Sequence, residues 1–585
     1  MNEPPEPLVR VEGVTYTHWN QGAPSLRDIS LTIQTGTVNV LIGPGGSGKS
    51  TLCSLLNGEI PQLLGGKLEG EVWVGGQNTA EAKVRDLAQV VGHVFQDPES
   101  MFSTLYVEDE IAFGPENLQQ EPHVIRQRVD ELLAETQLTP QRNNLVWNLS
   151  GGQIQKLGLA AILAMQPAMI VLDEPTANLD PIATHAVHEL IERLKQQGMT
   201  ILLVTRELDD FVLSMCDQLL VLEEGRLFAC GSPQQVLQEH GAYILDVLGV
   251  WLPETVEIAI ELQKRAPGEV KSLPITVPDT LAYLRASGVL GDRLELSSPP
   301  LEMVTHDQPL VSARDLTYTY PNGFQALRGI SFDIYAGELL AVVGRNGAGK
   351  STLARLLVGL QKPTSGELDL FGKNAPLWKV EDLAREIALV FQNPEHQFLT
   401  DTVFDEIAYS VMARGTTDRS EIDRQVQETL SQLELTAVRD RHPFALSAGM
   451  KRRLGVATML VGHPRILLVD EPTYGQDKQM TRTLMALMQD VVEQGITVMM
   501  ITHDMRLVLE YAQRVMVMND GLVTFTGDPA DLFCSEELLL SANLRPTLLQ
   551  ELLSAYQQDG GCVCCNIRTT DDFINALDIE GMRTG

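Results

Sequence analysis

One set of motifs occurs twice along the chain, in the same order and at nearly the same spacing. The segment Gly43-Pro-Gly-Gly-Ser-Gly-Lys-Ser50 returns 301 residues later as Gly344-Arg-Asn-Gly-Ala-Gly-Lys-Ser351, and Asp173-Glu-Pro-Thr176 returns 297 residues later as Asp470-Glu-Pro-Thr473. Such repetition indicates two homologous domains in tandem. We therefore expect a first domain at residues 8–245, followed by a helical extension and linker at 246–307. The second domain would span 308–535, followed by a helical extension and flexible tail at 536–585.

Within each repeat, the apolar residues follow the pattern of an α/β protein. Short apolar runs such as Val38–Ile42 and Ile466–Val469 have the length of strands that are buried on both faces. The segment after each Gly-rich turn has the spacing of a helix. Buried strands that alternate with helices predict an α/β fold around a parallel sheet.

The composition excludes several classes of protein. The chain holds 44 Lys and Arg against 77 Asp and Glu, a net charge of −33, so we expect no nucleic-acid partner. No segment approaches the ~18 apolar residues of a membrane span, and the N-terminus lacks the features of a signal peptide. Seven scattered cysteines indicate reduced thiols and a cytosolic protein. We expect Cys562-Val-Cys-Cys565 to be a free tail, because no second ligand pair stands at metal-binding spacing.

The two Gly-x4-Gly-Lys-Ser segments have the features of phosphate-binding loops. Glycines let consecutive backbone N–H groups face one point, and the lysine that follows can contact the β- and γ-phosphates. The next hydroxyl can ligate Mg²⁺. The predicted binding residues are Gly43, Pro44, Gly45, Gly46, Ser47, Gly48, Lys49, Ser50, Thr51, Gly344, Arg345, Asn346, Gly347, Ala348, Gly349, Lys350, Ser351 and Thr352.

An acidic pair follows an apolar strand in each repeat. Asp173 and Asp470 end these strands, where a carboxylate can hold Mg²⁺, usually through water. Glu174 and Glu471 come next and are placed to orient or activate an attacking water. A helix cap would explain one such pair, but its return at a fixed distance from a phosphate loop favours the catalytic interpretation.

With Gln96 and Gln392 in Val-Phe-Gln segments, and Leu149-Ser-Gly-Gly-Gln153, these motifs resemble those of the ATP-binding-cassette (ABC) ATPases over nearly the whole chain. The resemblance implies two phosphate-loop ABC domains, α/β with a mixed sheet, each with a helical signature subdomain. It implies that the two cassettes pair head to tail within the chain and bind two ATP molecules. Each ATP would be capped by the signature of the other cassette: Ser150, Gly151 and Gly152, or Ser447 and Gly449. The implied Mg²⁺ ligands are Ser50, Gln96, Asp173, Ser351, Gln392 and Asp470.

Departures from the family pattern fall on one of the two expected sites. The first repeat has Arg206 where the second has His503, and the second signature reads Leu446-Ser-Ala-Gly-Met450. A Cβ at Ala448 should loosen closure, and a permanently charged Arg206 cannot act as a switchable imidazole. We expect the site with Lys350, Glu471, His503 and Gln392 to be the more active. Equal sites with tolerated drift remain the alternative, since Glu174 and Gln96 are present.

The residue that stacks on adenine is predicted from the same resemblance. In the second repeat Tyr320 fits, because an aromatic residue upstream of the phosphate loop has this role in the family. In the first repeat the position is His18, with Trp19 beside it, and either could stack.

The resemblance is greatest to the ATPases of energy-coupling-factor (ECF) importers. The segments that are similar to that subfamily are Ile111–Leu118, Val390–Gln397, Thr402–Ala408 and Tyr474–Asp477. The resemblance implies that the Gln loop and the helix after it form a groove for helices of a membrane scaffold, which works with a substrate-capture protein. For residues 102–118 and 398–408, plain core helix is the alternative interpretation. The implied substrates are vitamins, vitamin precursors or metal ions, and the implied location is the cytoplasmic face of the membrane. A fused ATPase of a sugar or peptide importer is the main alternative. A ribosome-associated protein is less favoured, because residues 246–307 contain no basic run.

Overall fold

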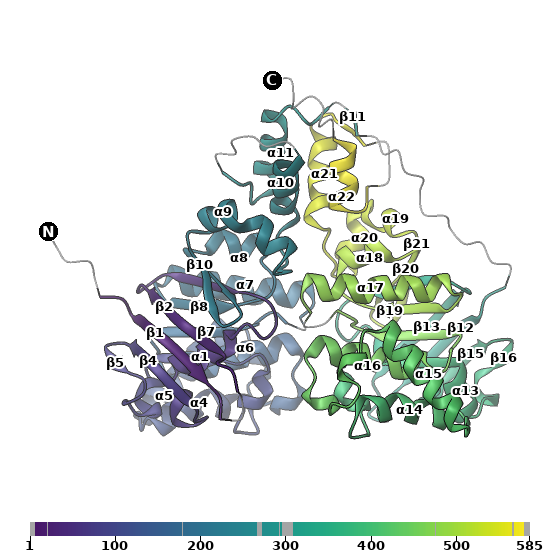
Figure 1. Ribbon diagram of the computed structural model, residues 1–585, viewed down its shortest axis with the longest axis horizontal. Coiled ribbons are helices and arrows are strands. Elements are labelled where there is room, and N and C mark those ends of the chain that lie inside the picture. The colour runs from purple at the N-terminus through teal and green to yellow at the C-terminus, as the bar shows by residue number, and fades with distance from the viewer. Residues whose placement is uncertain are drawn as a thin grey trace. The chain divides into compact units, whose positions relative to one another are not determined.

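The computed structural model describes residues 6–19, 22–177, 179–265, 272–291, 293–294, 308–473, 476–563 and 567–577; the side chains of Ala448 and Glu536 are not described. The chain separates into two compact units, Met1–Thr280 and Leu281–Gly585, with the boundary inside one helix (Figure 1). Among the described residues, no helix has both the length and the apolar character needed to cross a bilayer. Each unit is considered by itself below.

The first unit contains an antiparallel sheet, β2-β1-β4-β5, and a larger sheet, β10-β9-β3-β8-β7-β6, whose pairs are parallel except at β10. The strands are β1 (Val9–Thr17), β2 (Leu26–Ile33), β3 (Val38–Ile42), β4 (Lys67–Val74), β5 (Gln77–Asn78), β6 (Val91–Val94), β7 (Met169–Asp173), β8 (Thr200–Val204), β9 (Gln218–Glu223) and β10 (Arg226–Gly231). The helices are α1 (Lys49–Leu56), α2 (Glu59–Gln62), α3 (Val84–Leu87), α4 (Val107–Asn117), α5 (Pro122–Glu135), α6 (Gly151–Leu163), α7 (Pro181–Gln196), α8 (Asp210–Met215), α9 (Pro233–Asp246), α10 (Glu254–Arg265) and α11 (Val277–Ala286), with short 3-10 turns η1 (Pro98–Met101), η2 (Thr139–Gln141) and η3 (Val146–Asn148).

The second unit repeats this topology, with sheets β13-β12-β15-β16 and β17-β18-β19-β14-β20-β21. Its strands are β11 (Arg293–Leu294), β12 (Val311–Thr319), β13 (Gln325–Ile334), β14 (Leu339–Val343), β15 (Ser365–Leu370), β16 (Lys373–Asn374), β17 (Ile387–Val390), β18 (Ile466–Asp470), β19 (Thr497–Ile501), β20 (Arg514–Asn519), β21 (Leu522–Gly527) and β22 (Cys562–Val563). Its helices are α12 (Lys350–Leu357), α13 (Val380–Glu386), α14 (Val403–Ala413), α15 (Arg419–Gln432), α16 (Ala448–Leu460), α17 (Lys478–Glu493), α18 (Met505–Tyr511), α19 (Pro529–Phe533), α20 (Glu536–Ser541), α21 (Leu548–Gln558) and α22 (Thr570–Ala576), with η4 (Ala375–Leu377), η5 (Pro394–Gln397), η6 (Thr436–Val438) and η7 (Pro443–Ala445).

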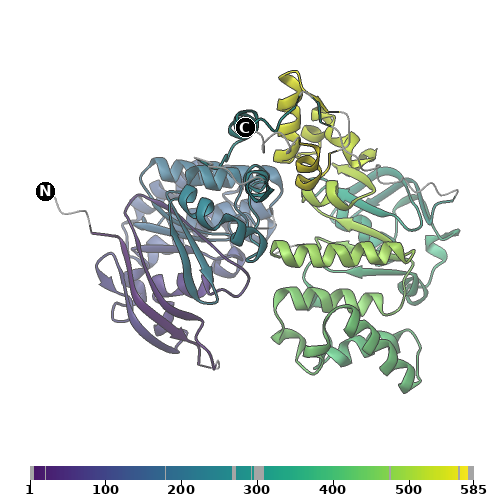
Figure 2. The same ribbon diagram turned by 45° about the horizontal axis from the view of Figure 1, so that its top comes forward.

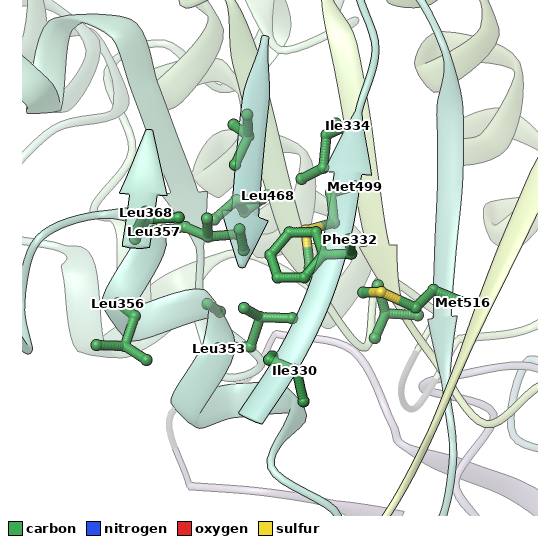
Figure 3. Packing of buried hydrophobic residues seen from close by; sticks show 14 of the residues in the cluster. Ile330, Phe332, Ile334, Leu353, Leu356, Leu357, Leu368, Leu468, Met499 and Met516 are labelled. Carbon is green, nitrogen blue, oxygen red and sulfur yellow. The ribbon is translucent and has the colours of Figure 1, made fainter. Parts of the chain in front are cut away.

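The main core of each unit lies between its two sheets. In the second unit, Phe332 of β13 lies near Leu353 of α12 and near Leu468 and Met499 of the larger sheet (Figure 3). Every residue of β3 and residues 466–469 of β18 are buried, which confirms the prediction of strands covered on both faces for these two segments. The α/β prediction is therefore correct, although the separate antiparallel sheet makes each unit a mixed structure. The green helices that include α14, α15 and α16 form a group beside the strands of the second unit (Figure 2).

The end of the chain differs from the expected flexible tail. Helix α22 is capped by Thr569, and Phe573 on it is only 1% exposed. Arg568 donates to both carboxylate oxygens of Asp528 at 2.8 Å. A helix as short as α22 has too few apolar residues for their spacing to predict it from sequence. Its position depends on the contact between Arg568 and Asp528, which is distant in the chain. Cys562 is exposed, whereas Cys564 and Cys565 lie outside the described residues.

Part of the expected linker belongs to the second unit. The two-residue strand β11 pairs in parallel with β22. Near this pair, the Tyr556 hydroxyl donates to the carbonyl of Gly291 at 2.7 Å, and Arg285 forms an ion pair with Asp559 at 2.7 Å. The residues after α11 are therefore packed against the C-terminal extension. Residues 266–271, 292 and 295–307 of the expected linker lie outside the described residues.

Candidate functional site

Each phosphate loop connects the central strand of the larger sheet to a helix. The first loop leads from β3 to α1 and the second leads from β14 to α12. Gly43 and Gly344 have φ of 151° and 139°, and a Cβ at either position would collide with a backbone carbonyl oxygen. The glycines are thus required by close packing against the neighbouring strand end as well as by backbone conformation.

The loop lysines are buried and point back into their own loops. Lys49 Nζ donates to the carbonyls of Gly43 at 2.7 Å and Pro44 at 3.0 Å, and Lys350 donates to Gly344 at 2.6 Å and Arg345 at 3.1 Å. Both lysines are 7% exposed. Burial lowers the pKa of Lys49 to about 8, and the nearby carboxylates only partly oppose this effect. An ammonium group is therefore held within each loop, where a phosphate would compensate its charge.

Beside each lysine, a hydroxyl meets a carboxylate. Ser50 Oγ donates to Asp173 Oδ2 at 3.0 Å, and Ser351 Oγ donates to Asp470 Oδ2 at 3.5 Å. Burial raises the pKa of Asp173 despite the serine hydrogen bond and the charge of Lys49. Hydroxyl and carboxylate oxygens are ligands that Mg²⁺ prefers, so this donor pair fits the predicted ion.

The two glutamates have the same backbone geometry but different partners. Glu174 and Glu471 have φ of 52° and 48°, and their N–H groups donate to the end of the neighbouring strand at 2.9 Å. Glu174 Oε1 lies 2.8 Å from Arg206 Nε, whereas Glu471 Oε1 lies 2.9 Å from His503 Nδ1. Burial raises the pKa of Glu174, and the charge of Arg206 opposes this.

The environment of His503 makes it a group that can carry a proton. Burial by itself lowers its pKa, but the hydrogen bond and charge of Glu471 outweigh that effect, so the pKa is raised above the ordinary value. In the first unit the partner of the glutamate is the guanidinium of Arg206. The structure thus places each glutamate beside a basic side chain, an arginine in the first unit and a histidine in the second.

The Gln loops lie near the same edge of the sheet. Gln96 follows β6 and Gln392 follows β17, and each of these strands pairs in parallel with the strand that ends in Asp173 or Asp470. Gln96 is half-buried and Gln392 is exposed. The topology therefore brings the Gln loop and the Asp-Glu pair to one side of each unit.

The signature residues lie at the start of another helix. Ser150 caps α6, and its own N–H donates to Gln153 Oε1 at 3.0 Å, which completes a capping box. Ser447 caps α16 by accepting a hydrogen bond of 3.4 Å from the N–H of Met450. The Met450 side chain has no oxygen to accept the reciprocal bond from the N–H of Ser447, as Gln153 does from Ser150. The altered signature is thus also a weaker helix start. The side chain of Ala448 lies outside the described residues, so its effect on closure stays a prediction.

The predicted adenine-stacking residues have related settings. The Tyr320 hydroxyl lies 2.9 Å from Thr352 Oγ1, next to the phosphate loop, and its ring meets Tyr318 edge to face at 4.9 Å. His18 meets Tyr16 edge to face at 4.8 Å. Because His18 and Tyr320 each contact a tyrosine two residues earlier in the same way, His18 is the structural counterpart of Tyr320. The neighbouring Trp19 is 77% exposed.

Two buried carboxylates were missed by the sequence analysis. Glu110 on α4 and Glu406 on α14 are 4% and 3% exposed. Each accepts hydrogen bonds from two backbone N–H groups and a threonine hydroxyl of the preceding loop, Thr104 or Thr400, at 2.8–3.0 Å. They fix the segment between the Gln loop and the next helix. Their recurrence at the same place in both repeats was the signal available in the sequence.

Comparison with known proteins gives consistent matches. The family model described as ABC transporter matches residues 26–177 and 327–474. A putative ABC transporter ATP-binding protein of Methanosarcina acetivorans is 38% identical over 93% of this chain and 89% of its own length. A putative HMP/thiamine import ATP-binding protein, YkoD of Bacillus subtilis, is 36% identical over 94% of this chain and 97% of its own length.

A solved structure is also similar in sequence to part of the chain. It is cbiO1 from Clostridium perfringens, described as part of the ABC transporter complex cbiONQ. It is 31% identical, covers 42% of this chain and 100% of its own, and has a TM-score of 0.38.

Proposed function

Since the chain belongs to the ABC transporter family of ATP-binding proteins, we propose that it is the ATPase subunit of an ECF-type importer of a vitamin, a vitamin precursor or a metal ion. As an ABC ATPase it binds and hydrolyses ATP. The observation that carries the proposal is the similarity over nearly the full length to a protein named as an import ATPase for HMP and thiamine. A peripheral position on the cytoplasmic face of the membrane follows from this function.

For hydrolysis in the second cassette we propose the following roles of its residues. Water attacks the γ-phosphorus while the bond to the β–γ bridging oxygen breaks, which leaves ADP and phosphate. The Glu471 carboxylate orients this water and accepts its proton, and His503 stabilises the charge through its contact of 2.9 Å with Glu471. Lys350 moves from its loop carbonyls to the phosphates. Ser351, Asp470 and Gln392 would hold Mg²⁺, which neutralises phosphate charge when bound.

We propose that the two ATP sites differ in rate. The family resemblance pairs Lys350, Glu471 and His503 with the intact signature Ser150–Gly152, and pairs Lys49 with the altered signature. In the first cassette, Glu174 Oε1 forms an ion pair with Arg206 Nε at 2.8 Å. This ion pair occupies one carboxylate oxygen and leaves Glu174 less able to bind and polarise water. The second site is therefore the main site of hydrolysis, and the first mainly holds ATP.

Matched substitutions test this difference. Glu471→Gln is expected to abolish most of the ATPase activity of the full chain, while Glu174→Gln leaves a substantial part. The steady-state rate of phosphate release gives both values, and equilibrium binding of a fluorescent ATP analogue checks that each variant still binds nucleotide. Equal losses would refute the difference between the sites without affecting the transport proposal.

Exposed aromatic side chains at equivalent places in the two cassettes support a membrane partner. Phe113 on α4 and Tyr409 on α14 are 40% and 47% exposed, and Trp147 and Phe444, next to the signatures, are 58% and 49% exposed. Large apolar groups that recur on the surface in this way are typical of an interaction site. We assign them to short helices of the membrane scaffold, as the ECF resemblance implies for segments 102–118 and 398–408.

Co-purification from gently solubilised membranes tests the partner assignment. The tagged protein should retain one polytopic scaffold and a small hydrophobic protein, which mass spectrometry identifies. The double variant Phe113→Ser with Tyr409→Ser should lose them, whereas Leu377→Ser, a substitution at another exposed apolar residue, should not. A permease with a sugar- or peptide-binding protein would identify the alternative importer class, and ribosomes without membrane proteins would refute transport.

A further inference from the structure

The helix that follows the second signature carries a buried arginine with two backbone partners. Arg452 on α16 is 2% exposed. Its NH1 donates to the carbonyl of Phe391 at 2.7 Å, and its NH2 donates to the carbonyl of Glu471 at 2.9 Å. Phe391 immediately precedes Gln392, so one guanidinium connects three elements of the cassette: the signature helix, the Gln loop and the Asp-Glu motif.

A neighbouring contact strengthens the same connection. Lys451 Nζ lies 2.5 Å from Glu395 Oε1, on the turn η5 that follows Gln392. The lysine side chain is 17% exposed, so this ion pair is less screened than a pair at the open surface. The Gln loop of the second cassette is therefore joined to α16 by two charged contacts, one on each side of Gln392.

The first cassette has uncharged residues at both places. Ile154 stands where the second cassette has Lys451, and Gln155 stands where it has Arg452. Gln155 is 3% exposed, and its Oε1 has no hydrogen-bond partner among the described residues. A guanidinium offers five donors in a planar fork, which suits two separate carbonyl groups, and a glutamine amide cannot reproduce this.

We propose that Arg452 is a positioning residue that fixes Glu471 relative to the Gln loop, and that this link is built into the second cassette alone. The inference rests on the proposed role of Glu471 in hydrolysis. The backbone of Glu471 has a φ of 48°, a conformation that is unfavourable for a residue with a side chain. Glu174 has nearly the same φ, so the bond from Arg452 does not set the conformation itself. It fixes the carbonyl of Glu471, and with it the direction of the carboxylate, relative to Phe391. If a membrane partner displaces the Gln loops, the movement would therefore shift Glu471 but leave Glu174 in place.

The test is the ATPase activity of the full-length Arg452→Gln variant, which has the residue of the first cassette. We expect kcat to fall about tenfold, equivalent to ~1.4 kcal/mol, while the KM for ATP stays within about twofold of the wild-type value. The two carbonyls that accept hydrogen bonds from Arg452 belong to Phe391 and Glu471, not to the phosphate loop, so binding of a fluorescent ATP analogue should be retained. Arg452→Lys keeps the charge without the fork and should give an intermediate kcat.

Arg414→Gln is the control for simple loss of an arginine that donates to backbone carbonyls; Arg414 is half-buried. Arg414 donates to the carbonyl of Gly462 at 2.7 Å, beyond the far end of α16 and away from the nucleotide site. We expect this variant to lose thermal stability comparably but to keep its kcat within about twofold. The inference is overturned if Arg452→Gln keeps the wild-type kcat, if it loses ATP binding together with kcat, or if Arg414→Gln lowers kcat equally. If Glu471→Gln itself remains fully active, the proposed role of Glu471 fails instead.

Discussion

A buried histidine makes the stability of the first cassette sensitive to acid. His93 on β6 is 7% exposed, and its Nδ1 lies 3.2 Å from Asn57 Nδ2. Its Nε2 is buried without a hydrogen-bond partner among the described residues. Burial disfavours the charged ring and lowers the pKa of His93 to about 4. The second cassette has Val358 and Leu389 at the equivalent places.

The direction of the effect follows from proton linkage. Below pH 6.5 the unfolded chain binds a proton at His93 that the folded cassette does not, so acid favours unfolding. The contribution of neutral His93 is complete above about pH 6.5 and is lost as the pH falls toward 4. With a pKa near 6.5 unfolded and about 4 folded, the free energy of unfolding falls by about 2 kcal/mol between pH 7.5 and pH 5.

Urea unfolding at these two pH values measures the effect. Tryptophan fluorescence reports mainly on the first unit, because all but one of the tryptophans lie there: Trp19, Trp73, Trp147 and Trp251, against Trp378. The double variant Asn57→Val with His93→Leu should be about 2 kcal/mol less sensitive to this change of pH than the wild type. The exposed His123 supplies a control, since His123→Gln should keep the wild-type sensitivity. If the double variant loses as much stability in acid as the wild type, His93 is not the group responsible.

Two further results are expected. The pKa of Lys49 is about 8 and should rise when a phosphate binds beside it, so at pH 8 ATP binding should be accompanied by the uptake of about half a proton at Lys49. Calorimetry in buffers of different ionisation enthalpy measures this uptake, and Lys49→Arg should abolish it. Arg568→Met should destabilise the second unit by about 3 kcal/mol in calorimetric melting, because Asp528 loses its buried cationic partner, whereas Arg285→Met, at an exposed ion pair, should cost less than about 1 kcal/mol.

The duplicated architecture and the chemistry of the phosphate loops could be predicted from sequence. A loop such as Gly43–Ser50 acts through consecutive backbone groups, so its spacing specifies its geometry. Strands such as Ile466–Asp470 are short, apolar and covered on both faces, and their composition alone indicates this. The antiparallel sheet and residues 567–577 gave weaker local signals, because their stability comes from partners far along the chain.

The partners of Glu174 and Glu471 were decided by tertiary structure. Glu174 and Glu471 are followed by the same Pro-Thr in sequence, yet one is paired with Arg206 and the other with His503 and, through its carbonyl, with Arg452. The sequence by itself determined which chemical groups each cassette contains. Only the fold decided which groups touch, since parallel strands and the helices between them bring together side chains from separate segments at one edge of the sheet.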